Sequence, residues 1–290
     1  MSGGARLRPS ERLTVLVLVG LIGASLILHP AGWGLRAALF TGLLLMVLGL
    51  GYLREGPGMA LVRDLAPVAV VLLVFLLLQP LVGANPVRWD GALAAFDARW
   101  FGQLGSAWRG AFGRPAAFTD LVYLAYASFY LLPLSVPLLT RLRLGPERFE
   151  AVAFRILLGF YLSFLGYFLW PAEGPRVPNA MAAAELGGGA VSQVLRAFLR
   201  GAEATTLDAF PSGHTALSVL PALLATRRFP RLAPLFWAWA AAIVFATVYI
   251  RVHYVADVAA GLLLAGLTLI LAPPLSWALG DRRPPLSAPE

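Results

Sequence analysis

Long apolar runs separated by short polar connections dominate this sequence and decide what it can fold into. Hydrophobic residues make up 59% of the 290 residues, charged residues only 13%, and the mean hydropathy is +0.76. A soluble domain carries about 25% charged residues, whereas an apolar run of roughly 20 residues can cross a bilayer as a helix. The sequence therefore predicts an all-α integral membrane protein, a multi-pass helical bundle.

About eight segments are predicted to span the membrane. They cover residues 13–28, 37–53, 65–82, 118–140, 151–170, 211–226, 232–250 and 254–271. The first follows three arginines, as in a signal peptide, but no A-x-A-like cleavage site comes after it, so we expect a retained span. The sixth is short, and the Arg-rich turn at 227–231 supports it because this turn needs a side of the membrane to lie on.

The arginines predict how these spans are oriented. With the N-terminus inside, thirteen arginines fall on the cytoplasmic side and nine on the other side. Most of the nine lie in two long stretches, 83–117 and 171–210, to which the positive-inside rule gives less weight. Both termini are therefore predicted to be cytoplasmic, and both long stretches to lie outside.

The first outer stretch contains the segment WDGALAAFDARWFGQLGSAWRGAF. Apolar and aromatic side chains recur in it at helical intervals, with Asp90, Asp97, Arg99 and Arg109 between them. This pattern predicts an amphipathic helix at about 90–113 that lies at the membrane interface. Structural anchoring is the simpler interpretation of this helix, and lipid binding is the alternative.

Composition excludes several classes of function. The net charge is +8, but the arginines stand at the ends of apolar runs, which is typical of topology anchors and argues against nucleic-acid binding. The chain has no cysteine, so disulfides, thiolate catalysis and Cys-ligated metals are excluded. The sequence also contains no lysine, which suggests a GC-rich bacterial genome and hence a periplasmic or extracellular site.

Only three histidines are present, and two of them lie in informative settings. His29 stands beside a proline at the end of the first run, and we interpret it as an interfacial residue without a catalytic duty. His214 lies in PSGH, where proline and serine indicate a helix start. The N–H groups of such a start can bind an anion, and a histidine there can donate a proton. A capped helix with an interfacial histidine is the structural alternative.

The stretch HYVAD places His253 and Asp257 at i and i+4 on a predicted helix, so they share a face. A carboxylate that accepts one ring N–H leaves the other nitrogen basic and oriented. A polar pair that packs two helices is the alternative, but ionisable residues inside a membrane cost about 2.5–3.5 kcal/mol each, so function is the default hypothesis.

A third element, WPAEGPRVP, follows the fifth span. Its Gly-Pro turn presents Arg176, whose planar guanidinium can clamp a phosphate. The predicted topology places this turn, PSGH and HYVAD on one side of the membrane. Two histidines, a carboxylate and two arginines, Arg176 and Arg251, suit an anionic substrate such as a phosphate ester.

In this order and spacing, WPAEGPR, AFPSGHTA and VHYVADVAAG resemble the type 2 phosphatidic acid phosphatase superfamily. The similarity is greatest to its inositol phosphorylceramide synthase-like branch, and it covers roughly residues 86–262. The resemblance implies a six-helix catalytic membrane domain, here residues 64–277. It also implies that residues 1–63 are a two-span addition, and we expect 278–290 to be a disordered tail.

The resemblance further implies roles for individual residues. His253 matches the nucleophile that becomes a phosphohistidine, Asp257 its orienting carboxylate, and His214 the acid that protonates the leaving oxygen. Three further positions match the phosphate-binding groups: Ser212, Gly213 and Arg176. No metal and no other cofactor is expected, since arginines and backbone N–H groups neutralise the transition state.

Two phosphate-binding cations of the family are missing from their usual positions. Leu169 stands where the first motif has a lysine, and Ala246 and Thr247 stand where the third motif has Ser-Arg. Arg251, where the family often has glycine, is a candidate replacement for the missing arginine. On a continuous helix it would face away from His253, so it must lie in a turn to help.

Three hypotheses for the function follow. The first is a membrane-embedded phosphatase or phosphotransferase that acts on a phospholipid or polyprenyl phosphate, in a bacterial inner membrane with its active site on the extracytoplasmic side. Its partners would be the lipid phosphate and the bilayer. The second is a transporter that uses the histidines as a proton relay. The third is a metal-dependent hydrolase with Asp257 as a ligand.

Overall fold

The structure is a computed structural model that describes residues 7–28, 32–53, 56–102, 104–113, 115–176, 186–202 and 206–282. His29 and the end of the predicted tail lie outside these residues. Every regular element within them is a helix, which confirms the all-α prediction. The helices are α1 (Pro9–Leu28), α2 (Trp33–Leu50), α3 (Pro57–Gly83), α4 (Asp90–Trp100), α5 (Leu104–Phe112), α6 (Ala116–Ala127), the 3₁₀ turn η1 (Ser128–Tyr130), α7 (Leu132–Leu144), α8 (Pro146–Leu169), α10 (Ala190–Ala202), α11 (Gly213–Arg228), α12 (Ala233–Tyr249) and α13 (Val255–Ala278).

Each predicted span contains a helix, and the multi-pass membrane architecture is confirmed. Among the described helices, α1, α2, α3, α8 and α13 are long and apolar enough to cross a bilayer. The pair formed by α6 with η1 and α7 makes a sixth span if it is taken as one broken helix. The helices of the remaining two predicted spans, α11 and α12, have 16 and 17 residues, which is shorter than the 18 residues required of a spanning helix.

The predicted fourth span is broken by a bend of 51° between α6 and α7. Pro133 lies in the first turn of α7, and it has no N–H to continue the hydrogen-bond ladder of α6. The break therefore follows from a proline that the hydropathy pattern alone does not register. Phe129 of η1, at this break, contacts a residue of the site described below.

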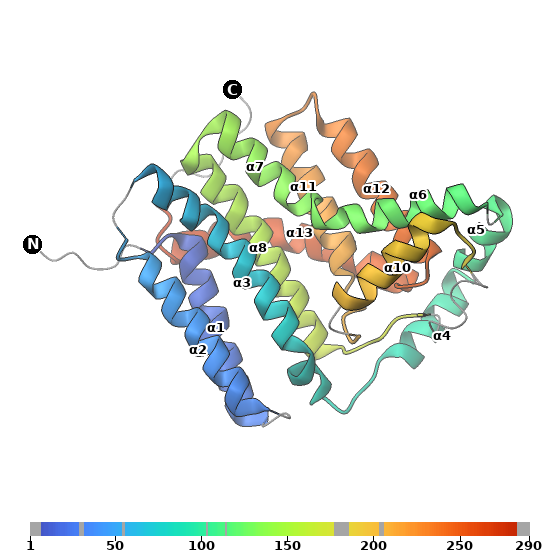
Figure 1. Cartoon of the computed structure of the whole chain (residues 1–290), viewed down its shortest axis with the longest axis horizontal. Helices are drawn as coiled ribbons and strands as arrows, with labels where there is room; N and C mark the ends of the chain where they lie inside the picture. Colours follow the sequence, from blue (N-terminus) through green and yellow to red (C-terminus); the bar gives the residue numbers. More distant parts are fainter. Residues whose placement is uncertain are drawn as a thin grey trace, which may run out of the picture.

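Helix α8 lies at the centre of the bundle, between α1, α3, α7, α11 and α13 (Figure 1). Gly159 allows α11 to approach it, because a Cβ at this position would lie 3.1 Å from both Leu217 and Leu220. One hydrophobic cluster joins α8 to α1, α2 and α3, and a second joins it to α7, α11, α12 and α13. The same helix thus supports both halves of the core.

The N-terminal pair of helices packs directly on the rest of the molecule. Helices α1 and α2 lie side by side at the edge of the bundle far from α4 and α5 (Figure 1). The buried Arg63 guanidinium donates to both carboxylate oxygens of Glu11, at 2.8 and 2.5 Å. Thr14 forms a hydrogen bond of 2.9 Å with Tyr161. These contacts link α1 to α3 and α8, and the domain boundary after residue 63 stays a prediction.

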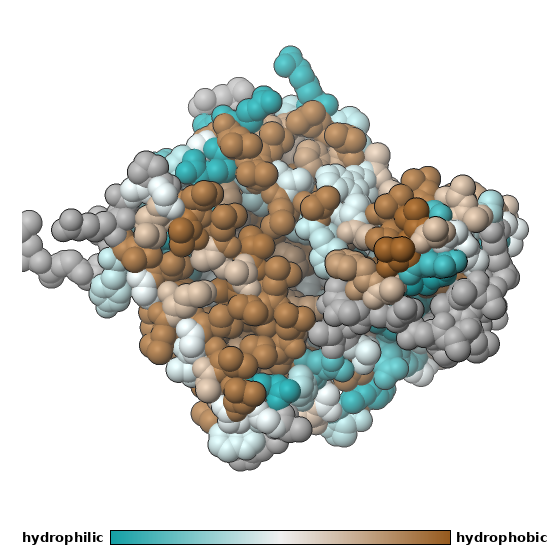
Figure 2. Space-filling view, viewed as in Figure 1, coloured by the Kyte–Doolittle hydropathy of each residue, from teal (hydrophilic) through white to brown (hydrophobic). Residues whose placement is uncertain are grey.

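A broad apolar surface covers the part of the molecule where α1, α2 and α3 lie (Figure 2). Large side chains on these helices are more than half exposed, among them Leu16, Leu45, Leu61 and Leu72. In water such a surface would be an aggregation hazard. It is instead the surface that an integral membrane protein presents to lipid acyl chains.

The two stretches that the sequence predicts to lie outside differ from the prediction in two ways. The helix predicted at about 90–113 is two helices, α4 and α5, separated at Gly102, whose φ of 59° ends a right-handed helix. Within the second stretch lies α10, which the sequence analysis did not identify. Asp120 on α6 accepts hydrogen bonds from the Gly189 and Ser192 N–H groups at 2.8 and 2.9 Å, and so caps the start of α10.

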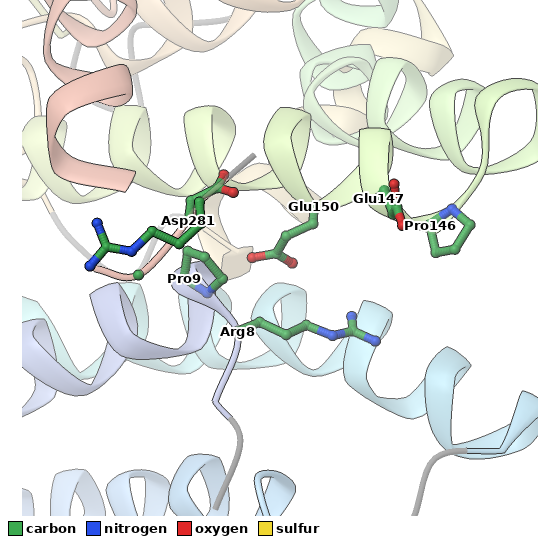
Figure 3. A pocket seen from close by; sticks show the side chains of 8 residues that line it. Arg8, Pro9, Pro146, Glu147, Glu150 and Asp281 are labelled. Atoms are coloured by element: carbon green, nitrogen blue, oxygen red, sulfur yellow. The ribbon is translucent and has the colours of Figure 1, made fainter. Parts of the chain in front are cut away.

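A cavity of about 490 Å³ opens where the first residues of α1 and α8 meet the C-terminal end of α13 (Figure 3). Charges of both signs line it, including Arg8, Glu147, Glu150 and Asp281. It lies at the N-terminal end of α8, whereas the WPAEGPR motif follows the C-terminal end. The cavity is therefore separate from the residues predicted to carry chemistry.

Candidate active site

The two informative histidines and the predicted carboxylate lie together in one chain of contacts. His253 Nδ1 is 3.4 Å from Asp257 Oδ2, and His253 Nε2 is 3.3 Å from His214 Nδ1. His253 is only 3% exposed and Asp257 is fully buried. His253 lies in the turn before α13, not within a helix as predicted, so the pair spans the start of that helix.

The chain of contacts fits one assignment of protons. With Asp257 ionised and His253 neutral, His253 Nδ1 donates to Asp257 and His253 Nε2 keeps a lone pair. In that assignment His214 Nδ1 donates to the lone pair. The arrangement gives His253 a nucleophilic nitrogen and His214 a proton that faces it. The Tyr254 N–H donates to Asp257 Oδ2 at 2.8 Å and holds the carboxylate in place.

The turn between α12 and α13 delivers His253 to this position. The Arg251 N–H donates to the Val248 carbonyl at 3.2 Å, and the Val252 N–H donates to the Thr247 carbonyl at 3.0 Å. This is the Schellman pattern, in which the residue after the helix cap adopts a left-handed conformation. That residue is Arg251, with a φ of 63°. The position favours glycine, which explains why a glycine is frequent there in the family that the motif resembles.

Arg251 therefore lies in a turn, as its predicted role requires, and its side chain is partly exposed. It interacts electrostatically with Tyr254, which precedes α13. Burial, followed by the nearby carboxylates of Asp90, Asp257 and Asp97, raises the pKa of Tyr254 to about 12. The Tyr254 hydroxyl is thus protonated at neutral pH. Thr247, at the expected arginine position, is fully buried and pins the turn through its carbonyl.

The PSGH motif begins α11 as predicted. Ser212 is the N-cap, and its side chain accepts from the Thr215 N–H at 3.2 Å. The Ser212 N–H donates to the Asp257 carbonyl at 3.0 Å, so the second and third motifs are joined through their backbones. A Cβ on Gly213 would lie 2.3 Å from the Tyr167 hydroxyl. Gly213 is therefore required for close packing against α8.

Two further glycines let the helices around the site approach one another. A Cβ on Gly261 of α13 would lie 2.6 Å from the Ser212 carbonyl oxygen. A Cβ on Gly166 of α8 would lie 2.2 Å from the ring of Pro211. Both contacts are closer than real Cβ atoms approach other heavy atoms, so both positions need glycine. The last residue of the VHYVADVAAG motif thus serves helix packing.

Aromatic side chains from the broken span hold His214. Its ring stacks on Tyr126, with 4.7 Å between centroids and 24° between planes. The ring also packs on Phe129 of η1, with 4.3 Å between centroids and 45° between planes. These contacts orient the imidazole toward His253, whose ring centroid is 5.5 Å away. The sequence analysis missed both aromatic residues, because they come from a segment without a recognisable motif.

Arg176 lies in a tight turn that packs on the nucleophile turn. Gly174 has a φ of 81°, and a Cβ there would lie 2.3 Å from the Val252 carbonyl oxygen. The Arg176 guanidinium donates to Asp208 Oδ1 at 2.7 Å and to the Glu173 carbonyl at 2.8 Å. It also interacts electrostatically with His214. Asp208, which precedes the second motif, is the ion-pair partner that the sequence analysis missed.

Two aspartates of α4 also contact the motifs. Asp90 accepts hydrogen bonds from the Glu173 and Gly174 N–H groups, and Asp97 accepts them from the Val255 and Ala256 N–H groups. The sequence analysis identified both aspartates only as polar residues of an interfacial helix. Helix α5 contributes Arg109, which donates to the Tyr249 carbonyl at 3.0 Å at the end of α12.

The donor set does not form a metal site in the part of the chain that the structure describes, because no three His, Asp or Glu side chains are arranged around one point. The histidine nitrogens instead face each other and a carboxylate. The predicted catalytic residues and Arg176 thus meet at one end of the bundle, and their roles stay predictions.

Comparison with known proteins agrees with the motifs. The family model described as the PAP2 superfamily matches residues 91–271, which is more than half of the chain. No curated protein matches the chain, and no solved structure does. The match does not resolve the inositol phosphorylceramide synthase-like branch. The chain therefore belongs to the PAP2 superfamily, and this membership supports a phosphatase-type lipid phosphoesterase.

Proposed function

We propose that the protein is a membrane-embedded phosphatase or phosphotransferase that acts on a phospholipid or a polyprenyl phosphate through a phosphohistidine at His253. The observation that carries this proposal is the chain from Asp257 through His253 to His214. It supplies an oriented nucleophile and a facing acid, which are the two groups that displacement at phosphorus needs.

In the first step, the lone pair of His253 Nε2 attacks phosphorus, and the bond from phosphorus to the leaving oxygen breaks. The electron pair of that bond goes to the leaving oxygen, which takes the Nδ1 proton of His214 in its imidazolium form and leaves His214 a neutral imidazole. Asp257 stabilises the positive charge that develops on His253. The two nitrogens are 3.3 Å apart, so the imidazole rings have to separate when the phosphoryl group enters between them.

In the second step, the hydroxyl of water or of an acceptor alcohol attacks the phosphohistidine. His214, now deprotonated, takes the hydroxyl proton, and the bond between Nε2 and phosphorus breaks. Water as acceptor makes the protein a phosphatase, and a lipid alcohol makes it a head-group transferase. The branch resemblance favours a transferase, and membership in the superfamily favours a phosphatase.

The phosphoryl oxygens are proposed to bind to Arg176 and to the start of α11 at Ser212 and Gly213, with Arg251 as an additional cation. Arg176 is supported by its contact with Asp208 and its proximity to His214. A guanidinium can exchange one carboxylate partner for a phosphate oxygen without moving far. The start of a helix adds the positive end of its dipole.

Replacement of His253 tests the nucleophile. We expect His253→Ala to abolish release of phosphate from a phospholipid mixture and to accumulate no acid-labile phosphate, whereas the wild type traps ³²P from labelled substrate. Vanadate, which mimics pentacoordinate phosphorus, should inhibit the wild type. Full activity of His253→Ala would refute the mechanism.

Replacement of His214 tests the acid. His214→Ala should slow poor leaving groups most, because good leaving groups need no proton. An equal loss across a series of leaving groups would assign His214 a different role.

Two other classes of function stay open to experiment. A transporter using the histidines as a proton relay would move label across proteoliposomes without releasing phosphate. A metal-dependent hydrolase would lose activity in EDTA and regain it with a divalent cation. We expect neither result, because Asp257 and His214 contact both nitrogens of His253, which suits a nucleophile with a facing acid and leaves neither nitrogen to bind a metal.

A further inference from the structure

Helix α4 forms hydrogen bonds with the first and third motifs and shares a buried cluster with residues of all three. Asp90, Leu93 and Asp97 lie along one face of the helix at helical spacing. Leu93 is 8% exposed, and it packs in a small cluster with Ala172, Ala209 and Ala256, which come from the first, second and third motif respectively. We propose that Asp90 and Asp97 are positioning residues for the reaction, which hold the phosphate-binding turn and the nucleophile turn in register. This inference rests on the proposed function, because it takes His253 and Arg176 as the reacting groups.

Asp97 completes the cap of α13. The first N–H groups of a helix need acceptors, usually a Ser, Thr, Asn or Asp side chain at the N-cap. The N-cap of α13 is Tyr254, and its capping box with Asp257 serves the Tyr254 and Asp257 N–H groups but not those of Val255 and Ala256. Asp97 Oδ2 accepts from the Val255 N–H at 2.6 Å, and Asp97 Oδ1 accepts from the Ala256 N–H at 2.9 Å.

The cap fixes the start of the helix that sets the distance between nucleophile and carboxylate. His253 lies two residues before the first capped N–H, and Asp257 lies one residue after the second. Each carboxylate oxygen of Asp97 serves one N–H, and its charge faces the positive end of the helix dipole. An asparagine offers only one acceptor oxygen, and its NH₂ group would face an N–H.

Asp90, two helical turns before Asp97 on α4, likewise accepts hydrogen bonds from the backbone of a turn in the site. Its Oδ1 accepts from the Glu173 and Gly174 N–H groups at 3.0 and 2.9 Å, and its Oδ2 is 3.1 Å from the Glu173 nitrogen. At Gly174 this turn packs closely against the Val252 carbonyl, and the same turn carries Arg176. Asp90 therefore holds the phosphate-binding arginine, and Asp97 holds the nucleophile.

The two positions predict different kinetic effects. A shift of about 1 Å in a reacting group can cost about 10²-fold in rate, so Asp97→Asn should lower kcat by about that factor with little change in KM. Asp90→Asn should raise KM for the lipid phosphate more than it lowers kcat, because it loosens phosphate binding. Asp97→Glu, which keeps both oxygens, should recover part of the lost kcat.

Asp120→Asn is the control for the loss of negative charge at a helix start. Asp120 Oδ1 also accepts two backbone N–H groups at the start of a helix, at 2.8 and 2.9 Å, but that helix, α10, carries none of the three motifs. Its replacement should leave kcat and KM unchanged. Equal kinetic losses in Asp97→Asn and Asp120→Asn would show a merely structural role and would overturn the proposal.

Amide hydrogen exchange in nanodiscs provides a readout that does not depend on turnover. In Asp97→Asn the amides of Val255 and Ala256 should exchange faster than in the wild type, and in Asp120→Asn they should not. Unchanged exchange together with normal kcat in Asp97→Asn would overturn the positioning role alone. Full activity of His253→Ala would instead refute the proposed function, while the exchange result would still report on the cap.

Discussion

At the scale of single residues, Arg251 shows how the chain combines strain with a candidate binding role. Its left-handed conformation closes the turn that carries His253. A residue with a Cβ pays roughly 1–2 kcal/mol for that conformation. A strained residue in such a turn suggests a function that outweighs its cost.

We expect Arg251→Gly to relieve this strain and to weaken phosphate binding. The greater freedom of glycine in the unfolded chain offsets part of the relief, so the free energy of unfolding should rise by up to about 1 kcal/mol. The KM for the lipid phosphate should rise as well, because a cation is lost. Thermal unfolding in detergent and steady-state kinetics measure the two effects.

Arg251→Gln is the control for this substitution, since it removes the charge but keeps the Cβ and its strain. It should share the higher KM without the gain in stability. An unchanged KM in both variants would make Arg251 a topology anchor only.

At the scale of elements, close helix contacts hold the site together. Helix α13 approaches α11 at Gly261, where a Cβ would lie 2.6 Å from the Ser212 carbonyl oxygen and 2.8 Å from Thr215 Cβ. The start of α11 can therefore lie in its position only because Gly261 of α13 has no side chain. The same helix carries Gly266, where a Cβ would meet nothing within 4 Å.

Replacing glycine by alanine is therefore predicted to have opposite effects on stability at Gly261 and Gly266. Gly261→Ala should destabilise the protein by roughly 1–3 kcal/mol through overpacking, and it should lower turnover because Ser212 moves. Gly266→Ala should be neutral or stabilising by up to about 1 kcal/mol, because alanine is the better helix former. Thermal unfolding of both variants checks this prediction, and equal effects would contradict the close contact.

The apolar runs predicted where the helices of the bundle lie, because about 20 apolar residues in a row indicate a membrane-spanning helix. Among the described helices, five are long and apolar enough to span, or six with the bent pair, against about eight predicted spans. The sequence also predicted the Ser212 cap and the meeting of His214, His253 and Asp257. Helix α10 was missed because it is short and carries Ser192 and Arg196 on its buried face. Asp90 and Asp97 were misinterpreted because their partners are backbone N–H groups that no side-chain motif marks.

At the scale of the whole molecule, the charged groups divide between two ends of the bundle. One end carries the three motifs. Near the start of α8 and the end of α7, Asp64 pairs with Arg8 and Arg141 at 2.7 Å each. Helix α8 runs between these ends, so the proposed orientation places the ion pairs in the cytoplasm and the motifs outside.

The absence of cysteine allows a direct test of this orientation. Glu173 lies within the first motif and Glu147 at the start of α8, and both are exposed. We expect a membrane-impermeant maleimide to label Glu173→Cys in intact cells and to label Glu147→Cys only after permeabilisation. The reverse pattern would place the active site in the cytoplasm.

The cluster around Leu93 has a consequence for how this protein can change through evolution. Ala172, Ala209 and Ala256 belong to separate motifs, yet they share one small buried cluster with Leu93. Residues that pack in one cluster have effects that do not add. A larger residue at one of the three alanines then needs a smaller residue elsewhere in the cluster, so these four positions should covary among relatives.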